Sequence, residues 1–314
     1  MTKQIAFLFP GQGSQSVGML NVFKGNTATA SLYASLSEEA HQALGQDLAS
    51  LIEQGPAESL NLTTNTQPAM LFADVMVYRA WLAAGGLPPQ LVAGHSLGEY
   101  AALVAAGVIR FSDALRLVRI RAQAMQEAVP VGQGGMAAIL GLSDEQVRQA
   151  CAMASQGGEV AEAVNFNAPS QVVIAGSAQG VKAACEHAKA LGAKRALELP
   201  VSAPFHSSLM QPASVKLASA LLQAEFSTPS VPLYNNIDVA TETDPGRIRD
   251  ALVRQAYGPV RWVETIEAMS KAGATLFVEC GPGKVLAGLV KRITDVPVVN
   301  LFDPESIQAA LQNQ

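Results

Sequence analysis

A serine between two glycines is the feature of this sequence best suited to chemistry. In Gly94-His95-Ser96-Leu97-Gly98 it follows the apolar run 91–93 and precedes a helical pattern. A sharp strand-to-helix turn exposes a serine hydroxyl, and the free N–H groups at the helix start can stabilise an oxyanion. The glycines could also form an ordinary turn, but the strand–turn–helix setting favours Ser96 as a nucleophile.

A serine nucleophile needs a general base, and the chain has four histidines. His41 and His187 lie in amphipathic helical patterns, which are typical of the surface. His95 adjoins Ser96 at a tight turn, so we expect its side chain to point away from the hydroxyl.

His206 lies in the loop 200–207, which Pro200 and Pro204 restrict. It follows Ser96 in the chain, which is the order seen in α/β-hydrolase-like folds. We therefore interpret His206 as the base, with a surface histidine as the alternative. No acid stands out as a third member, and Glu99 and Glu198 are candidates by proximity alone.

Arg121 is the third candidate. In the helical pattern 112–128, which we expect to begin at a Ser112 cap, Arg121 borders the apolar stripe that contains Val118 and Met125. A guanidinium near a buried face needs an anionic partner. That partner could be an internal carboxylate or a bound anion, and the sequence leaves both open.

The loop 9–15, Phe-Pro-Gly-Gln-Gly-Ser-Gln, is a poor dinucleotide loop, because the third glycine and the later acidic residue are missing. Its glycines would instead let a backbone N–H approach a bound acyl oxygen. Three scattered cysteines form no CxxC pair, and we expect them to be small buried residues in a reducing compartment. We therefore expect neither a cofactor nor a metal.

Strands that alternate with helices predict an α/β fold with a parallel sheet covered on both faces. For the large domain, 1–131 and 200–314, we expect strands at 5–9, 91–93, near 233 and at 275–279. We expect helices at 97–106, 112–128, 208–224, within 247–271 and from about 285, and two or three between 29 and 85 that include 67–84.

The segment 132–199 has a different pattern and predicts an inserted small domain. It begins with a glycine-rich joint, 132–135. Strands at 136–140, 160–165, 171–175 and 195–199 alternate with helices at 144–154 and 178–191. This β-α-β-β-α-β order is that of ferredoxin-like domains.

Composition excludes several classes of protein. Hydrophobic residues make up 49% of the 314 residues, which suits an ordered core. The net charge of −5 argues against nucleic-acid binding. The N-terminus lacks a signal-peptide pattern, and no apolar run is long enough for a membrane span, so we expect a soluble cytoplasmic protein.

Seven motifs occur in a fixed order along the chain. They are FPGQGSQ, GHSLGEY, RIRAQAMQ, VNFNAPSQVVIAG, APFHSSLM, RQAYGPVRW and ECGPGKVL. Together they resemble the malonyl-CoA:acyl carrier protein transacylases of bacterial type II fatty acid synthesis, over residues 4–300.

This resemblance implies an α/β-hydrolase-like large domain with a ferredoxin-like insert. It implies Ser96 as nucleophile and His206 as base, with the imidazole oriented by the backbone carbonyl of Gln255 instead of a carboxylate. It further implies an oxyanion hole at the N–H groups of Gln12 and Leu97.

Two more roles follow from the resemblance. Arg121 matches the arginine that binds the malonyl carboxylate. Phe205 matches the form associated with malonyl instead of methylmalonyl units.

The expected reaction moves malonyl from malonyl-CoA through a Ser96 ester to the phosphopantetheine thiol of acyl carrier protein. Three alternatives stay open: a serine hydrolase or thioesterase, a malonyl transferase that serves a polyketide synthase or malonate decarboxylase carrier, and a non-catalytic docking protein. We expect a monomer that binds its acidic carrier through Lys284, Lys291 and Arg292.

Overall fold

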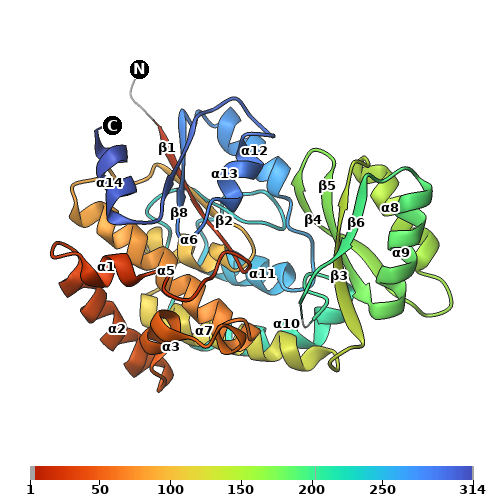
Figure 1. Cartoon of the computed structure of the whole chain (residues 1–314), viewed down its shortest axis with the longest axis horizontal. Coiled ribbons are helices and arrows are strands. Elements are labelled where there is room, and N and C mark those ends of the chain that lie inside the picture. The colour runs from red at the N-terminus through yellow and green to blue at the C-terminus, as the bar shows by residue number, and fades with distance from the viewer. Residues whose placement is uncertain (1–3, 202, 313–314) are drawn as a thin grey trace.

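The computed structural model describes residues 4–201 and 203–312. It contains a five-stranded parallel sheet and a separate four-stranded antiparallel sheet. In Figure 1 the antiparallel sheet, with α8 and α9, lies to one side of the larger part of the molecule. The predicted α/β class with a parallel sheet is therefore confirmed.

The parallel sheet carries the first motif loop and the serine turn at the ends of its strands. The strands, in spatial order, are β7 (Leu233–Tyr234), β2 (Leu91–Gly94), β1 (Ile5–Phe9), β8 (Leu276–Cys280) and β9 (Val298–Leu301). All five residues of β1 are buried. Phe7 and Phe9 pack into one core and Ala6 and Leu8 into another, because successive side chains of a strand point to opposite faces.

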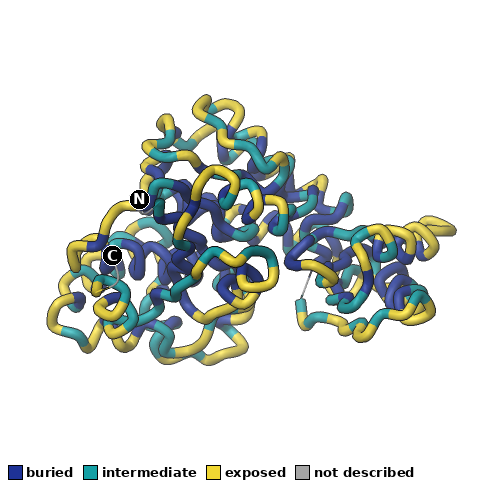
Figure 2. Tube along the Cα trace, turned by 90° about the horizontal axis from the view of Figure 1, so that it is seen from above, coloured by how far each residue is buried: buried dark blue, intermediate teal, exposed yellow. Residues whose placement is uncertain are grey.

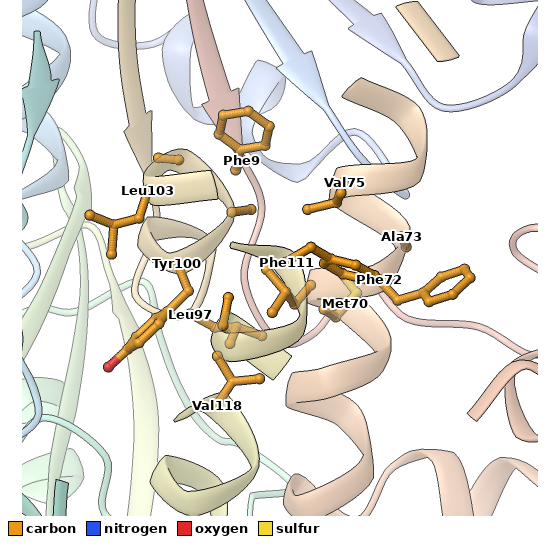
Figure 3. Close-up of a cluster of buried hydrophobic side chains, with 14 of the residues drawn as sticks. Phe9, Met70, Phe72, Ala73, Val75, Leu97, Tyr100, Leu103, Phe111 and Val118 are labelled. Carbon is orange, nitrogen blue, oxygen red and sulfur yellow. The ribbon is translucent and has the colours of Figure 1, made fainter. Parts of the chain in front are cut away.

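Helices cover both faces of this sheet. In chain order they are α1 (Asn21–Gly25), α2 (Ala30–Leu44), α3 (Leu48–Gln54), α4 (Ala57–Leu60), α5 (Thr63–Ala83), α6 (Gly98–Ala105), α7 (Phe111–Ala128), α10 (Gln211–Gln223), α11 (Pro245–Gln255), α12 (Trp262–Lys271), α13 (Val285–Val290) and α14 (Pro304–Leu311). Side chains of α5, α6 and α7 interdigitate beside Phe9 (Figure 3). Residues of α12 and α13 pack on the opposite face. None of the helices in the described ranges combines the length and the apolar character needed to cross a bilayer.

The antiparallel sheet has its own core. Its strands, in spatial order, are β4 (Ala161–Ala168), β5 (Gln171–Ser177), β3 (Gly134–Leu140) and β6 (Arg195–Glu198). Helices α8 (Asp144–Ala154) and α9 (Ala178–Ala190) cover one face and bury Ile139, Val172 and Ile174. Buried stretches of chain occur inside both parts of the molecule (Figure 2).

The other face of the antiparallel sheet turns toward the serine. Met136, Val164 and Val173 form a small apolar cluster there, and Phe205, which directly precedes His206, packs against it. The small sheet therefore forms one wall of the region that holds the candidate base.

Several sequence expectations need correction. Helix α7 begins at Phe111, with Arg110 as an extended N-cap residue and no side-chain cap, so the predicted Ser112 cap is wrong. The single helix expected over 208–224 is a 3-10 turn, Ser208–Met210, followed by α10, which has a proline in its first turn. Between 29 and 85 the described chain forms four helices instead of two or three, and α1, β9 and α14 were not predicted.

Candidate active site

Ser96 lies on a strained turn between β2 and α6. Its φ is 53°, in the left-handed region that residues other than glycine rarely adopt. A Cβ on Gly94 would lie 1.9 Å from the carbonyl carbon of Gly98, and a Cβ on Gly98 would lie 2.1 Å from the carbonyl oxygen of Phe9. Only glycine fits at both positions, so the two glycines are needed to hold Ser96 at the end of the sheet.

The hydroxyl of Ser96 contacts His206. Ser96 Oγ lies 2.6 Å from His206 Nε2, and His206 Nδ1 lies 2.8 Å from the carbonyl oxygen of Gln255. A carbonyl can only accept, so Nδ1 carries the proton and Nε2 is left to accept from the serine. This is the protonation state that a general base requires.

Two side chains hold the backbone of Ser96. Its N–H donates to Asn236 Oδ1 at 2.6 Å, and its carbonyl accepts from Gln255 Nε2 at 2.9 Å. Asn236 Nδ2 also donates to the carbonyl of Gly94 at 2.7 Å. These contacts fix the turn on both sides of Ser96.

Arg121, on α7, reaches the same hydroxyl. Its Nη2 donates to Ser96 Oγ at 3.1 Å and to Gln255 Oε1 at 3.0 Å, and its Nη1 donates to Gln67 Oε1 at 2.9 Å. The side chain is 2% exposed. No carboxylate oxygen of the described residues lies within 4.0 Å of its nitrogens, so Arg121 forms no internal salt bridge there.

Burial controls the charges of this site. It lowers the pKa of His206 to about 3, with the charge of Arg121 as the second cause, so the imidazole is neutral at physiological pH. Burial also raises the pKa of Glu99 to about 7, although hydrogen bonds from Gln255 and Asn236 oppose this shift. Burial lowers the pKa of Arg121 as well.

Gln12 and Leu97 carry the two backbone N–H groups that the sequence predicts for an oxyanion hole. Leu97 directly precedes α6, and Gln12 lies in the loop after β1. Within residues 4–201 and 203–312, neither N–H donates to a protein acceptor. Both residues line the pocket that contains Ser96.

This pocket has a volume of about 250 Å³ and lies between the two sheets. Ser96, Arg121 and His206 line it from the side of the parallel sheet. The opposite wall is apolar and includes Met136, Val173, Leu199, Val201 and Phe205.

His95 also lines the pocket, but it does not contact the Ser96 hydroxyl. Its Nε2 lies 2.7 Å from Asn167 Oδ1, and its ring meets Trp262 edge-on, at 5.3 Å between centroids. Its side chain therefore points away from the Ser96 hydroxyl, as expected. Of the two acids considered, Glu99 contacts Gln255 and Asn236 instead of His206, and Glu198 is exposed on β6.

Sequence reasoning gave no role to Gln67, Asn167 and Asn236. Asn236 directly follows Tyr234 and Asn235 at the carboxyl end of β7, and polar residues at that edge of a parallel sheet are a usable signal. Asn167 lies inside a motif that was noticed but not interpreted. Gln67 lies in the first turns of α5, and its sequence neighbours carry no comparable signal.

Comparison with known proteins identifies the family. The model of the acyl transferase domain family matches residues 6–300. The malonyl CoA-acyl carrier protein transacylase of Salmonella typhimurium is 54% identical over 312 residues, which are 98% of this chain and 99% of that protein. The crystal structure of an acyl-carrier-protein S-malonyltransferase from Burkholderia pseudomallei has a TM-score of 0.95 at 60% identity, covering 99% of this chain and 100% of the other. A malonyl-transacylase solved in complex with a type II polyketide synthase acyl-carrier protein has a TM-score of 0.96 at 49% identity, covering 99% and 100%. The chain therefore belongs to the acyl transferase family, among the malonyl CoA-acyl carrier protein transacylases.

Proposed function

We propose that this protein transfers a malonyl group from malonyl-CoA to the phosphopantetheine thiol of acyl carrier protein, through an ester on Ser96. One observation carries this proposal. The same hydroxyl that lies 2.6 Å from His206 Nε2 also lies 3.1 Å from the buried guanidinium of Arg121. A nucleophile and a buried cation at one point suit an acyl group that carries its own carboxylate.

Arg121 binds that carboxylate in our proposal. A malonyl carboxylate that enters the pocket loses water, and a guanidinium replaces the water with two charge-assisted hydrogen bonds. The amide oxygens of Gln67 and Gln255 hold the guanidinium without neutralising it. The charge of Arg121 is therefore available to the substrate.

In the first half-reaction, Ser96 Oγ attacks the thioester carbon while its proton passes to His206 Nε2. The N–H groups of Gln12 and Leu97 stabilise the resulting oxyanion. The C–S bond then breaks, the sulfur of coenzyme A takes the proton from His206, and the malonyl ester of Ser96 is left.

In the second half-reaction, the carrier thiol gives its proton to His206 and attacks the ester carbon. The C–O bond breaks, and the proton returns to Ser96 Oγ. Neither half-reaction changes an oxidation state, and the residues named supply every proton transfer, so the proposal includes no cofactor and no metal.

The carrier docks beside α13 in our proposal. Val285 and Leu286 of this helix line the pocket, and Lys284 and Lys291 flank it as exposed cations. Arg292, the third candidate, donates to the carbonyl of Pro169 at 2.7 Å and so also ties α13 to the turn between β4 and β5. Because the protein has a net charge of −5, local cations are needed to attract an acidic carrier.

We also propose two domains and a size limit on the acyl group. The strand order of β3–β6 and the separate core of α8 and α9 support a ferredoxin-like insert at 132–199. The strand–turn–helix around Ser96 supports an α/β-hydrolase-like domain at 1–131 and 200–314, of which residues 1–3, 202 and 313–314 lie outside the described residues.

In our proposal the side chain of Phe205, which lines the pocket, limits the size of the acyl group and so favours malonyl over methylmalonyl units. Three buried cysteines support a reducing cytoplasm, and the remaining expectation is a monomer.

Mass spectrometry of the intact protein tests this proposal. Incubation with malonyl-CoA should add one malonyl group, and holo acyl carrier protein should then remove it and become malonylated. Ser96→Ala should lose the label and at least about 10³-fold of the transfer rate, because no other group is positioned to form the ester. Persistent malonylation of this variant would refute the assignment.

Two rival functions predict different products. A hydrolase would release free malonate from the labelled protein without a carrier. A transferase for polyketide synthesis would prefer that pathway's carrier, and the relative solved with a polyketide synthase carrier gives this rival a specific basis. Discharge rates of the malonyl enzyme with each carrier separate the two pathways.

A further inference from the structure

Glu99 is a buried acid beside the nucleophile that the proposed reaction does not use. It lies in the first turn of α6, three residues after Ser96, and is 1% exposed. Its Oε2 accepts from the backbone N–H of Asn236 at 3.0 Å and from Nε2 of Gln255 at 3.0 Å. One carboxylate oxygen therefore holds both residues that clamp the backbone of Ser96.

The contact with Gln255 fixes the orientation of an amide. Gln255 Nε2 donates to Glu99 Oε2 and to the carbonyl of Ser96, and an ionised carboxylate and a carbonyl can only accept. The amide oxygen must then point the opposite way, where it accepts from Arg121 Nη2 at 3.0 Å. In the flipped orientation this oxygen would face two acceptors, and the amide nitrogen would face a guanidinium.

The same glutamine serves Arg121 and His206 through different atoms. Its side-chain oxygen holds Arg121, whereas its backbone oxygen accepts from His206 Nδ1. A change at Glu99 releases the side chain of Gln255 but leaves its backbone in α11. Glu99 should therefore influence Arg121 more than it influences the base.

We propose that Glu99 is a positioning residue for acyl selectivity, which holds the amide of Gln255 so that Arg121 points at the carboxylate of the acyl group. This inference rests on the proposed function, because it assumes that Arg121 binds that carboxylate. Glu99 has no hydrogen bond to Ser96 Oγ. In this proposal its effect on selectivity passes through Gln255, whereas its contact with the N–H of Asn236 supports the Ser96 backbone for either thioester.

The test compares two thioesters that differ only in the carboxylate. The rate constant for acylation of Ser96 is measured with malonyl-CoA and with acetyl-CoA for wild type, Glu99→Gln and Glu99→Ala. Loss of the acceptor leaves a buried donor unpaired, so Glu99→Ala should lower the malonyl-to-acetyl ratio by about five- to one-hundred-fold. Glu99→Gln keeps one acceptor oxygen without the charge, so its ratio should fall less, by about five-fold.

Asp74→Asn is the matched control. Asp74 is also a fully buried carboxylate, but it lies in α5 and contacts neither Gln255 nor Arg121. Its neutralisation should leave the malonyl-to-acetyl ratio unchanged. Thermal unfolding of each variant reports whether it folds. If Glu99→Ala does not fold, the malonyl-to-acetyl ratio of Glu99→Gln alone decides the test.

Equal losses with both thioesters, or an unchanged ratio in Glu99→Gln, would overturn the inference and leave Glu99 as a structural acid of the turn. The proposed function is judged separately. It fails if wild type shows no preference for malonyl-CoA or if Arg121→Ala does not reduce that preference, whatever the Glu99 variants do.

Discussion

Ser96 and His206, whose side chains are 2.6 Å apart, both have a backbone in the left-handed region, with φ of 53° and 67°. Each such residue other than glycine costs about 1–3 kcal/mol and persists only where its surroundings impose it. Asn236 and Gln255 hold the backbone of Ser96, and Gln255 also holds the ring of His206. The short contact is thus imposed by the surrounding fold, which prepares the pair before substrate binds.

Removal of His206 should affect transfer as strongly as removal of the nucleophile. We expect His206→Ala to lose about 10³-fold or more in kcat/KM. The protein should stay folded, because His206 lies in a loop and its ring does not pack in the core of a sheet. Since the two residues act as a unit, Ser96→Ala/His206→Ala should be little worse than either single variant. Transfer kinetics of the three variants check this, and losses that multiply would show that His206 acts elsewhere.

Arg121 should separate carboxylated from plain acyl groups. Arg121→Ala leaves the malonyl carboxylate desolvated and unpaired, which costs about 2–5 kcal/mol, or roughly 30-fold to several thousand-fold in kcat/KM. Acetyl-CoA has no carboxylate and should escape this loss. Measurement of kcat/KM for both thioesters should therefore show that malonyl selectivity collapses.

Arg121→Lys is the graded control for that experiment. An ammonium keeps the charge but cannot form the planar two-point contact, so the lysine variant should recover only part of the selectivity. Equal falls for both thioesters in Arg121→Ala would make Arg121 a structural residue and remove the main physical support for malonyl as the substrate.

The pH dependence of malonyl transfer should follow Glu99 instead of His206. The pKa of His206 is about 3, so the base stays neutral over the working range. Glu99 has a pKa of about 7, and below that pH it gains a proton and loses the charged acceptor that holds Gln255. The charged and titratable groups around it are Arg121, Asp238 and Tyr100.

We therefore expect kcat/KM for malonyl-CoA to fall below about pH 7 in wild type but not in Glu99→Gln, whose rate should resemble that of wild type at low pH. Acetyl-CoA should show the weaker dependence. An acid limb of the same size and midpoint in both proteins would assign it to another group.

Asp74 should make stability depend on pH. Both of its carboxylate oxygens are buried without a hydrogen-bond partner in the described chain, and burial, together with nearby Glu279, raises its pKa well above the usual range. A raised folded pKa means that the stabilisation is complete below the unfolded pKa of 3.8 and is lost as pH rises through the folded pKa.

Asp74→Asn should remove the loss of folding stability that wild type shows as the pH rises. Relative to wild type, the variant should gain up to about 1.4 kcal/mol in unfolding free energy for each pH unit above 4, until the folded pKa is reached. Urea unfolding of both proteins between pH 5 and 8 measures the difference. A difference that stays constant over this range would mean that Asp74 has an ordinary pKa.

The regular elements with strong periodicity were predictable from the sequence. The helix 144–154 was predicted with the bounds that the structure shows, where Ser143 caps it and Gln146 completes a capping box that marks its start. The end of α7 was also correct, but the predicted cap, Ser112, lies two residues after the observed cap, Arg110, which makes no side-chain cap hydrogen bond and gives no cap signal. Strand β9 is half-buried at the sheet edge, so its pattern carries less information.

The residues of the site also differ in how well a local sequence pattern predicts them. Ser96 stands out because its turn demands glycines at fixed positions, and Arg121 because a cation borders an apolar stripe. Gln67, Asn236 and the role of Glu99 depend on contacts across 54 to 156 residues of chain, and no local pattern specifies those contacts. Amide side chains also fit many environments, so their residue type alone predicts little.

Two residues of the pocket's apolar wall come from the small sheet, whereas Ser96, His206 and Arg121 belong to the larger part of the chain. Met136 and Val173 stand on strands β3 and β5, which pack on helices of their own and not on α6 or α7. Substitutions in this sheet can thus change the size of the acyl group that the pocket accepts, while the hydrogen bonds around Ser96 stay intact. Relatives with bulkier or branched substrates would then differ in strands β3 and β5 or at position 205 before they differ at the serine turn.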